Sequence, residues 1–90
     1  MRVIEVQPTP NPNAMKFMLD AAISQQPISC LNAQAAQSNE VARRLFEVNG
    51  VTSVLMLGDF VTVNKEPNAN WTEIKRGVKK VLNTAGVEDI

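Results

Sequence analysis

The sequence predicts an α+β domain in which two helices pack on one face of a mostly antiparallel sheet. Five short segments rich in β-branched residues alternate apolar and polar side chains, as strands do. Two further segments carry apolar residues at helical spacing, and each ends near a glycine. The elements follow the order β-β-β-α-β-β-α, and residues 1–90 are expected to form a single domain.

The N-terminal part supplies three of the predicted strands. Its segments are a strand at 2–6, a strand at 14–19, a loop at 20–27 and a short strand at 28–31. Between the first two strands stand three prolines at alternate positions, Pro8, Pro10 and Pro12. Proline cannot donate to a sheet and favours an extended path, so this loop is expected to be a rigid connection.

The first helix is predicted over 39–48. Ser38 is the expected cap, and Glu40 lies in the first turn, where the helix dipole favours negative charge. Gly50 is placed to end the helix. The buried stripe is predicted at Val41, Leu45 and Val48, with Ala42 and Phe46 beside it.

Strands at 51–57 and 60–65 flank Gly58 and Asp59, which suit a two-residue hairpin turn. The expected pairs are Met56 with Val61 and Val54 with Val63 on one face, and Leu57 with Phe60 and Leu55 with Thr62 on the other. A sheet covered on one side needs only one apolar face. The second apolar face therefore indicates either a partner surface or a slipped register.

The last helix follows a turn at 66–70. Asn70 and Glu73 form an expected capping box, and Gly86 is expected to end the helix. Its buried stripe is predicted at Trp71, Ile74, Val78, Val81, Leu82 and Ala85. Gly77 in the helix interior costs roughly 1 kcal/mol relative to alanine. Such a glycine indicates close packing of the helix on the sheet.

The composition argues against several functional classes. Nine basic residues balance nine acidic ones, whereas a dedicated nucleic-acid binder usually carries a basic excess. There is a single cysteine, so no internal disulfide forms, and no apolar run approaches the ~18 residues of a membrane span. We expect a cytoplasmic protein that is a monomer or weak dimer, with no nucleic-acid partner and no membrane association.

Groups suited to catalysis are scarce, and the expected protein is not an enzyme. The carboxylates are scattered, and the sequence has no histidine to activate Cys30 as a nucleophile. Cys30 is expected to be a small core residue. The alternative is a weak metal ligand that bridges two chains of a dimer. No cofactor is expected.

Basic side chains gather on the two predicted helices. They are Arg43, Arg44, Lys75, Arg76, Lys79 and Lys80. This cluster is either a solvated helix surface or a docking patch for an acidic partner.

Four separated motifs resemble those of the Nfu/NifU N-terminal domain family. They are "TPNPNAMKF" (9–17), "SNEVARRLFEVNGV" (38–51), "GDFVTVNK" (58–65) and "NWTEIK" (70–75). Asn39 departs from the proline that usually follows the helix-capping serine. The cysteine pair, Cys-x-x-Cys, that holds an iron–sulfur cluster in two-domain members belongs to a second domain. The 90 residues contain one cysteine and no such pair, so the cluster-carrying role is not expected to transfer to them.

The resemblance implies a non-enzymatic protein-interaction module linked to iron–sulfur cluster assembly or delivery. Its partner would be an iron–sulfur carrier or a client apoprotein, bound through the proline loop and the nearby sheet surface. The expected partner-binding residues are Thr9, Pro10, Asn11, Pro12, Asn13, Lys16, Phe17, Arg43 and Phe60. Two alternatives remain. One is direct iron or cluster binding through Cys30 across a dimer. The other is a small-ligand or anion-binding domain that uses Asn11, Asn13, Lys16 and Arg43.

Overall fold

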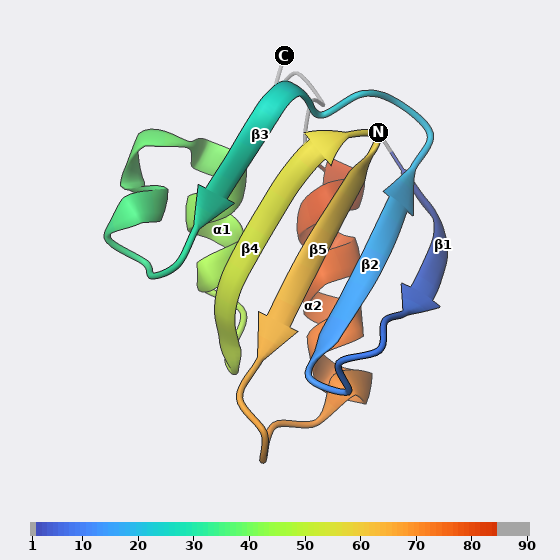
Figure 1. The fold of residues 1–90 in the computed structure, drawn as a ribbon, viewed down its shortest axis with the longest axis vertical. Helices are drawn as coiled ribbons and strands as arrows, with labels where there is room; N and C mark the ends of the chain where they lie inside the picture. The colour runs from blue at the N-terminus through green and yellow to red at the C-terminus, as the bar shows by residue number, and fades with distance from the viewer. Residues whose placement is uncertain (1, 85–90) are drawn as a thin grey trace.

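The structure, a computed structural model, describes residues 2–84 and shows a five-stranded sheet with both helices on one face (Figure 1). In chain order the elements are β1 (Val3–Pro8), β2 (Ala14–Leu19), β3 (Ser24–Cys30), a 3₁₀ turn η1 (Ala35–Ser38), α1 (Glu40–Phe46), β4 (Val51–Gly58), β5 (Phe60–Lys65) and α2 (Trp71–Thr84). Every neighbouring pair in the sheet order β1-β2-β5-β4-β3 is antiparallel. The predicted fold class and element order are confirmed.

The β4–β5 hairpin has the register that its sequence predicts. Leu57 lies opposite Phe60, and Met56 lies opposite Val61. Gly58 has a φ of 59°, which a residue with a side chain rarely adopts, so the turn requires glycine at this position. The register has not slipped, and the second apolar face of the hairpin is real.

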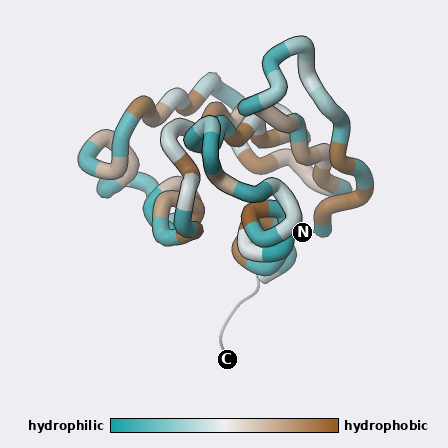
Figure 2. The backbone as a smooth tube through the Cα atoms, turned by 90° about the horizontal axis from the view of Figure 1, so that it is seen from below, coloured by the Kyte–Doolittle hydropathy of each residue, from teal (hydrophilic) through white to brown (hydrophobic). Residues whose placement is uncertain are grey.

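The core lies between the sheet and the helices, which Figure 2 shows on the same side of the sheet. Its largest fully buried side chains are Phe17, Leu19, Leu45, Val54, Met56, Val61, Val63, Ile74, Val78 and Leu82. They come from alternate positions on the strands and from one stripe on each helix, as the two periodicities require. In the stretch 2–84, no helix has both the length and the apolarity needed to cross a bilayer.

The third strand is longer than predicted. It begins at Ser24 rather than at residue 28, so the prediction of a loop over 20–27 was wrong for its second half. β3 is an edge strand, and its register against β4 shifts between Ser24 and Ile28. Proline has no backbone N–H to donate. An edge strand tolerates Pro27, because the backbone nitrogen at this position can face solvent and needs no partner strand. Leu31, predicted as the end of the strand, lies beyond it and is 76% exposed.

The first helix is capped one residue later than predicted. The side-chain oxygen of Asn39 accepts from the backbone N–H of Ala42 at 3.0 Å, whereas Ser38 is the last residue of η1. The helix ends at Phe46, so Val48 lies in the segment that leads to β4. Gly50 in that segment has a φ of 100°, so the chain reverses there through a conformation that favours glycine.

The second helix begins where the sequence predicts. Asn70 Oδ1 accepts from the backbone N–H of Thr72 at 2.7 Å and caps it. Gly77 packs closely, but against the segment after α1 and not against the sheet. A Cβ placed on Gly77 would lie 2.9 Å from Cγ1 of Val48. The predicted ends of the helix at Ala85 and Gly86 lie outside the described residues.

Candidate functional site

The proline loop between β1 and β2 is tied to the turn between β5 and α2. Lys65 Nζ donates to Asn13 Oδ1 at 3.0 Å, and the Lys65 backbone N–H donates to the Asn13 carbonyl at 2.8 Å. Trp71 Nε1 donates to the carbonyl of Pro12 at 3.0 Å. The proline-loop motif at 9–17 therefore meets the motifs at 58–65 and 70–75 at one end of the sheet.

Lys65 is the only buried charged side chain in the described part of the chain, at 8% exposed. Its ammonium group also lies 3.1 Å from the carbonyl of Glu66 and 3.4 Å from that of Pro67. It stands 5.7 Å from the centre of the Trp71 ring. A buried ammonium is tolerated when acceptors surround it, so Lys65 fastens the two loops together.

Most polar side chains of the proline loop are engaged within the loop itself. Thr9 Oγ1 lies 2.9 Å from the Asn11 carbonyl and 3.0 Å from the Ala14 carbonyl. Asn11 Oδ1 accepts from the Asn13 backbone N–H at 2.9 Å. Pro10, Asn11 and Pro12 remain exposed. Internal hydrogen bonds thus hold the conformation of the loop, while the residues at its tip stay accessible to a partner.

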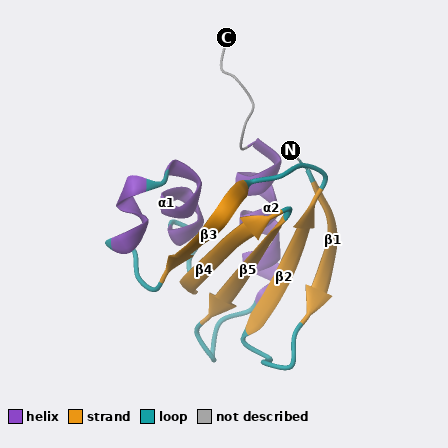
Figure 3. Cartoon of the chain, turned by 45° about the horizontal axis from the view of Figure 1, so that its top comes forward, coloured by secondary structure: helices purple, strands orange, loops and turns teal. Residues whose placement is uncertain are grey.

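No helix covers the face of the sheet that points away from α1 and α2, as Figure 3 shows. Because successive strand residues point to opposite faces, Met18, Leu55, Leu57 and Phe60 share this open face. Met18 pairs with Phe60, and Phe60 pairs with Leu57, so three of them form a row across β2, β5 and β4. None of the four belongs to the core or packs against it.

Lys16 lies beside this row and brings the only charge that β2 places on the open face. Its Nζ stands 4.2 Å from the centre of the Phe60 ring, a cation–π contact. Lys16 pairs with Thr62, which in turn pairs with Leu55. The structure therefore brings Lys16 and Phe60 together, as the expected site requires.

Two of the expected site residues lie elsewhere. Phe17 is fully buried on the helix side of the sheet, so the prediction that it contacts a partner was wrong. It sits between Lys16 and Met18 in a strand, and the alternation of side chains sends it to the opposite face. Arg43 lies on α1, with its guanidinium 3.9 Å from the Glu40 carboxylate. It belongs to the helix layer and not to the open face.

Sequence reasoning missed Leu55, Leu57 and Met18 as members of the site, and Lys65 as its anchor. The signal for Leu55 and Leu57 was the hairpin register, which already placed both on the second apolar face. For Lys65 the signal was the alternation along the strand. Lys65 lies two and four residues after Val63 and Val61, so its side chain points to the same buried face as theirs.

Cys30 faces the helix layer and is 3% exposed, with Sγ 3.8 Å from the carbonyl of Ala35. A second chain cannot reach this thiol while the fold is intact. Within residues 2–84, no group of three or more histidine, cysteine, aspartate or glutamate side chains could hold a metal ion.

Residues 4–88 match the family described as the scaffold protein Nfu/NifU N terminal. Among curated proteins, the mitochondrial NFU1 iron–sulfur cluster scaffold homolog of Drosophila erecta is 37% identical over 81 residues. The match covers 88% of this chain and 29% of that relative. Conserved virulence factor C of Staphylococcus haemolyticus is 27% identical over 89 residues, which make up 99% of this chain and 24% of that protein. The chain thus spans under a third of the length of these relatives.

Solved structures share the fold. The crystal structure of protein SAV1430 from Staphylococcus aureus superposes with a TM-score of 0.76 at 29% identity, covering 91% of this chain and 99% of that one. The solution structure of a NifU-like protein from Saccharomyces cerevisiae gives a TM-score of 0.74 at 26% identity, covering 93% and 79%. The chain belongs to the family of Nfu/NifU N-terminal domains of scaffold proteins.

Proposed function

We propose that this domain is a non-enzymatic protein-interaction module of iron–sulfur cluster assembly. It binds an iron–sulfur carrier or a client apoprotein on the open face of its sheet. The observation that carries the proposal is the row of Met18, Phe60 and Leu57, extended by Leu55, on a face that no helix covers.

Physical reasoning supports a docking role for this face. A sheet covered on one side usually presents polar residues to water on the other, so a row of half-buried apolar neighbours on that face favours a partner. Lys16 adds a charge that selects for an acidic group on the partner. The proline loop lies at one end of β2 and stays rigid through Lys65 and Trp71, so its exposed tip loses little freedom on binding.

The chemistry of the chain supports a role without catalysis. The sequence contains no histidine, and its one thiol is buried. Neither a cysteine–histidine pair nor an exposed nucleophile of that kind is available. The small-ligand alternative is less well supported, because the structure places Arg43 on the helix layer, away from the loop and from Lys16.

A capture experiment tests the proposal. The purified domain, tethered to resin, is incubated with lysate of its native cells at low and at moderate salt, and bound proteins are identified by mass spectrometry. We expect enrichment of iron–sulfur carriers or client apoproteins. The double variant Leu55→Gln/Leu57→Gln should lose this enrichment, because it makes two apolar positions of the open face polar. It should still fold, because neither side chain belongs to the core.

The matched control is Ile4→Gln, the same kind of change at an apolar side chain that is 65% exposed and outside the row. It should capture the same proteins as the parent. Absence of any iron–sulfur protein from the parent eluate, or equal capture by the double variant, would contradict the proposal. The dispersion of amide signals in NMR spectra verifies that each variant is folded.

The proposal includes a cytoplasmic location and a monomer or weak dimer, as the sequence analysis expects. The Drosophila relatives carry the word mitochondrial in their names. Fractionation of native cells and sedimentation of the purified chain test these two points separately.

A further inference from the structure

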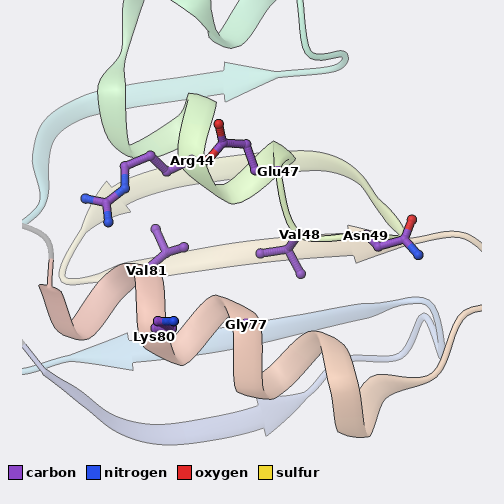
Figure 4. A pocket seen from close by; sticks show the side chains of 7 residues that line it. All are labelled: Arg44, Glu47, Val48, Asn49, Gly77, Lys80 and Val81. Atoms are coloured by element: carbon purple, nitrogen blue, oxygen red, sulfur yellow. The ribbon is translucent and has the colours of Figure 1, made fainter.

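A second surface lies on the helix layer, opposite to the open face of the sheet. It is a cleft of about 450 Å³, open to solvent, between the end of α1 and the middle of α2 (Figure 4). Its lining is Arg44, Glu47, Val48, Asn49, Gly77, Lys80 and Val81. A volume of this size is within the range of pockets that hold small molecules or short peptide segments.

The floor of the cleft is apolar and is shaped by a close approach. Gly77 lets α2 come so near that an added Cβ would lie 2.9 Å from Val48. Val48 and Val81 both lie partly buried against the core. In Figure 4 Val48 lies near the middle of the cleft and Val81 lies closer to Arg44 and Lys80. This floor suits an aliphatic side chain.

The cationic side chains stand at one end of this floor. Arg44 and Lys80 come from different helices and lie toward the same end in Figure 4. Arg44 Nη2 donates to Thr84 Oγ1 at 3.3 Å, which steadies the guanidinium. Within residues 2–84 its other N–H donors have no hydrogen-bond partner, so they can reach a ligand. Glu47 is the one acidic lining residue, and its carboxylate is directed away from α2.

Charge is segregated in the molecule. The net charge of the whole chain is zero, whereas residues 40–47 and 71–84 carry six basic and three acidic side chains. The helix layer therefore attracts acidic partners more strongly than the balanced sequence suggests. Asn49 stands at the opposite end of the cleft from Arg44 and can both donate to and accept from a peptide group.

We propose that this cleft binds an acidic segment of a protein partner, in which a carboxylate neighbours a small aliphatic residue. The carboxylate meets Arg44 and Lys80, the aliphatic group lies on Val48 and Val81, and the peptide backbone meets Asn49. A free inorganic anion would use only the basic end and leave the apolar floor empty. This inference stands apart from the function proposed above, because the two surfaces lie on opposite layers.

The direct test is a titration of the ¹⁵N-labelled domain, followed by amide chemical shifts. The probe is the peptide acetyl-Val-Glu-Val-Glu-amide. We expect saturable shifts that concentrate at residues 44–49 and 77–81. The peptide acetyl-Gly-Glu-Gly-Glu-amide, with equal charge and no aliphatic groups, should bind several-fold more weakly. Inorganic phosphate at matched ionic strength should bind more weakly than either.

A pair of matched variants localises the contact. Arg44→Gln/Lys80→Gln removes one charge from each helix within the cleft. Arg43→Gln/Lys79→Gln removes the same charges from the neighbouring positions, which do not line it. We expect about tenfold weaker peptide binding for the first variant and less than twofold for the second, since two partly exposed ion pairs account for roughly one decade.

Equal weakening in both variants would show diffuse attraction and overturn the inference. So would phosphate competing as strongly as the peptide, since the ligand would then be a free anion, or an absence of localised shifts with the parent. Leu55→Gln/Leu57→Gln should bind the peptide like the parent. Failure of this inference can therefore be distinguished from failure of the function proposed for the open face.

Discussion

The Nζ of Lys65 and the side-chain oxygen of Asn13 lie 3.0 Å apart, although 52 positions separate the two residues in the chain. This contact joins the proline loop to the β5–α2 turn in the interior of the protein. The loop that carries the family signature is thus held by a residue of a second motif.

Lys65→Met should destabilise the domain by about 2 kcal/mol, because it removes charge-assisted hydrogen bonds and leaves buried acceptors unpaired. Urea denaturation followed by circular dichroism measures the change. Lys79→Met, the same change at an exposed position of α2, should lie within about 0.5 kcal/mol of the parent. Equal effects at the two positions would mean that Lys65 has no anchoring role.

The effects of substitutions at Gly77 and Val48 on the free energy of unfolding should not be additive. Gly77→Ala gains about 1 kcal/mol of helix propensity, but the new methyl group is forced against Val48 and costs about 1–3 kcal/mol. Val48→Ala removes the obstructing methyl groups. A double-mutant cycle measured by urea denaturation should therefore show a favourable coupling of about 1 kcal/mol. Simple additivity of the two changes would contradict the close approach.

Truncation of Phe17 should destabilise the domain far more than truncation of Phe60. Phe17→Ala opens a cavity in the core and should cost about 3–5 kcal/mol, enough to leave a domain of this size marginally folded. Phe60→Ala, on the open face, should cost about 1 kcal/mol and act chiefly on partner capture. Thermal unfolding of both variants compares them, and a larger loss for Phe60 would invert the assignment of faces.

Cys30 should neither bind iron nor react readily. Anaerobic reconstitution with iron and sulfide is expected to leave the parent and Cys30→Ser equally free of bound iron, as judged by absorbance and iron analysis. A thiol reagent should modify Cys30 slowly in buffer and rapidly in urea, because only unfolding exposes the sulfur. Iron retained by the parent and lost by the variant would revive the bridged-dimer hypothesis.

Local patterns predicted the hairpin pairs from Val54 to Val63, because the turn at Gly58 fixes the register and the alternation fixes the faces. The shift of register between Val51 and Ser53 was not predicted. Local patterns predicted β3 poorly, since Gln25, Gln26 and Pro27 read as a loop unless the strand is known to lie at an edge. The cap of α1 was misplaced by one residue because serine and asparagine are equally good caps, and tertiary packing chooses between them.

The candidate site was predictable only in part. Lys16 and Phe60 lie together on the open face, but the pairing of β2 with β5 that brings them together was not predicted from the sequence. Phe17 could have been excluded by its alternation with Met15 and Leu19. Arg43 could also have been excluded, because both helices were expected on the face of the sheet opposite to the open one. The cleft between the helices could not be predicted, since it depends on the close approach of Gly77 to Val48, which no local pattern reports.

Trp71 is the only tryptophan in the sequence. Its indole N–H is bonded to the carbonyl of Pro12, and its ring lies near the Lys65 ammonium. The fluorescence of this single tryptophan therefore reports on the attachment of the proline loop. Release of the proline loop should change the intrinsic fluorescence before the helical circular dichroism changes, so the two signals together distinguish opening of this loop from loss of the whole fold.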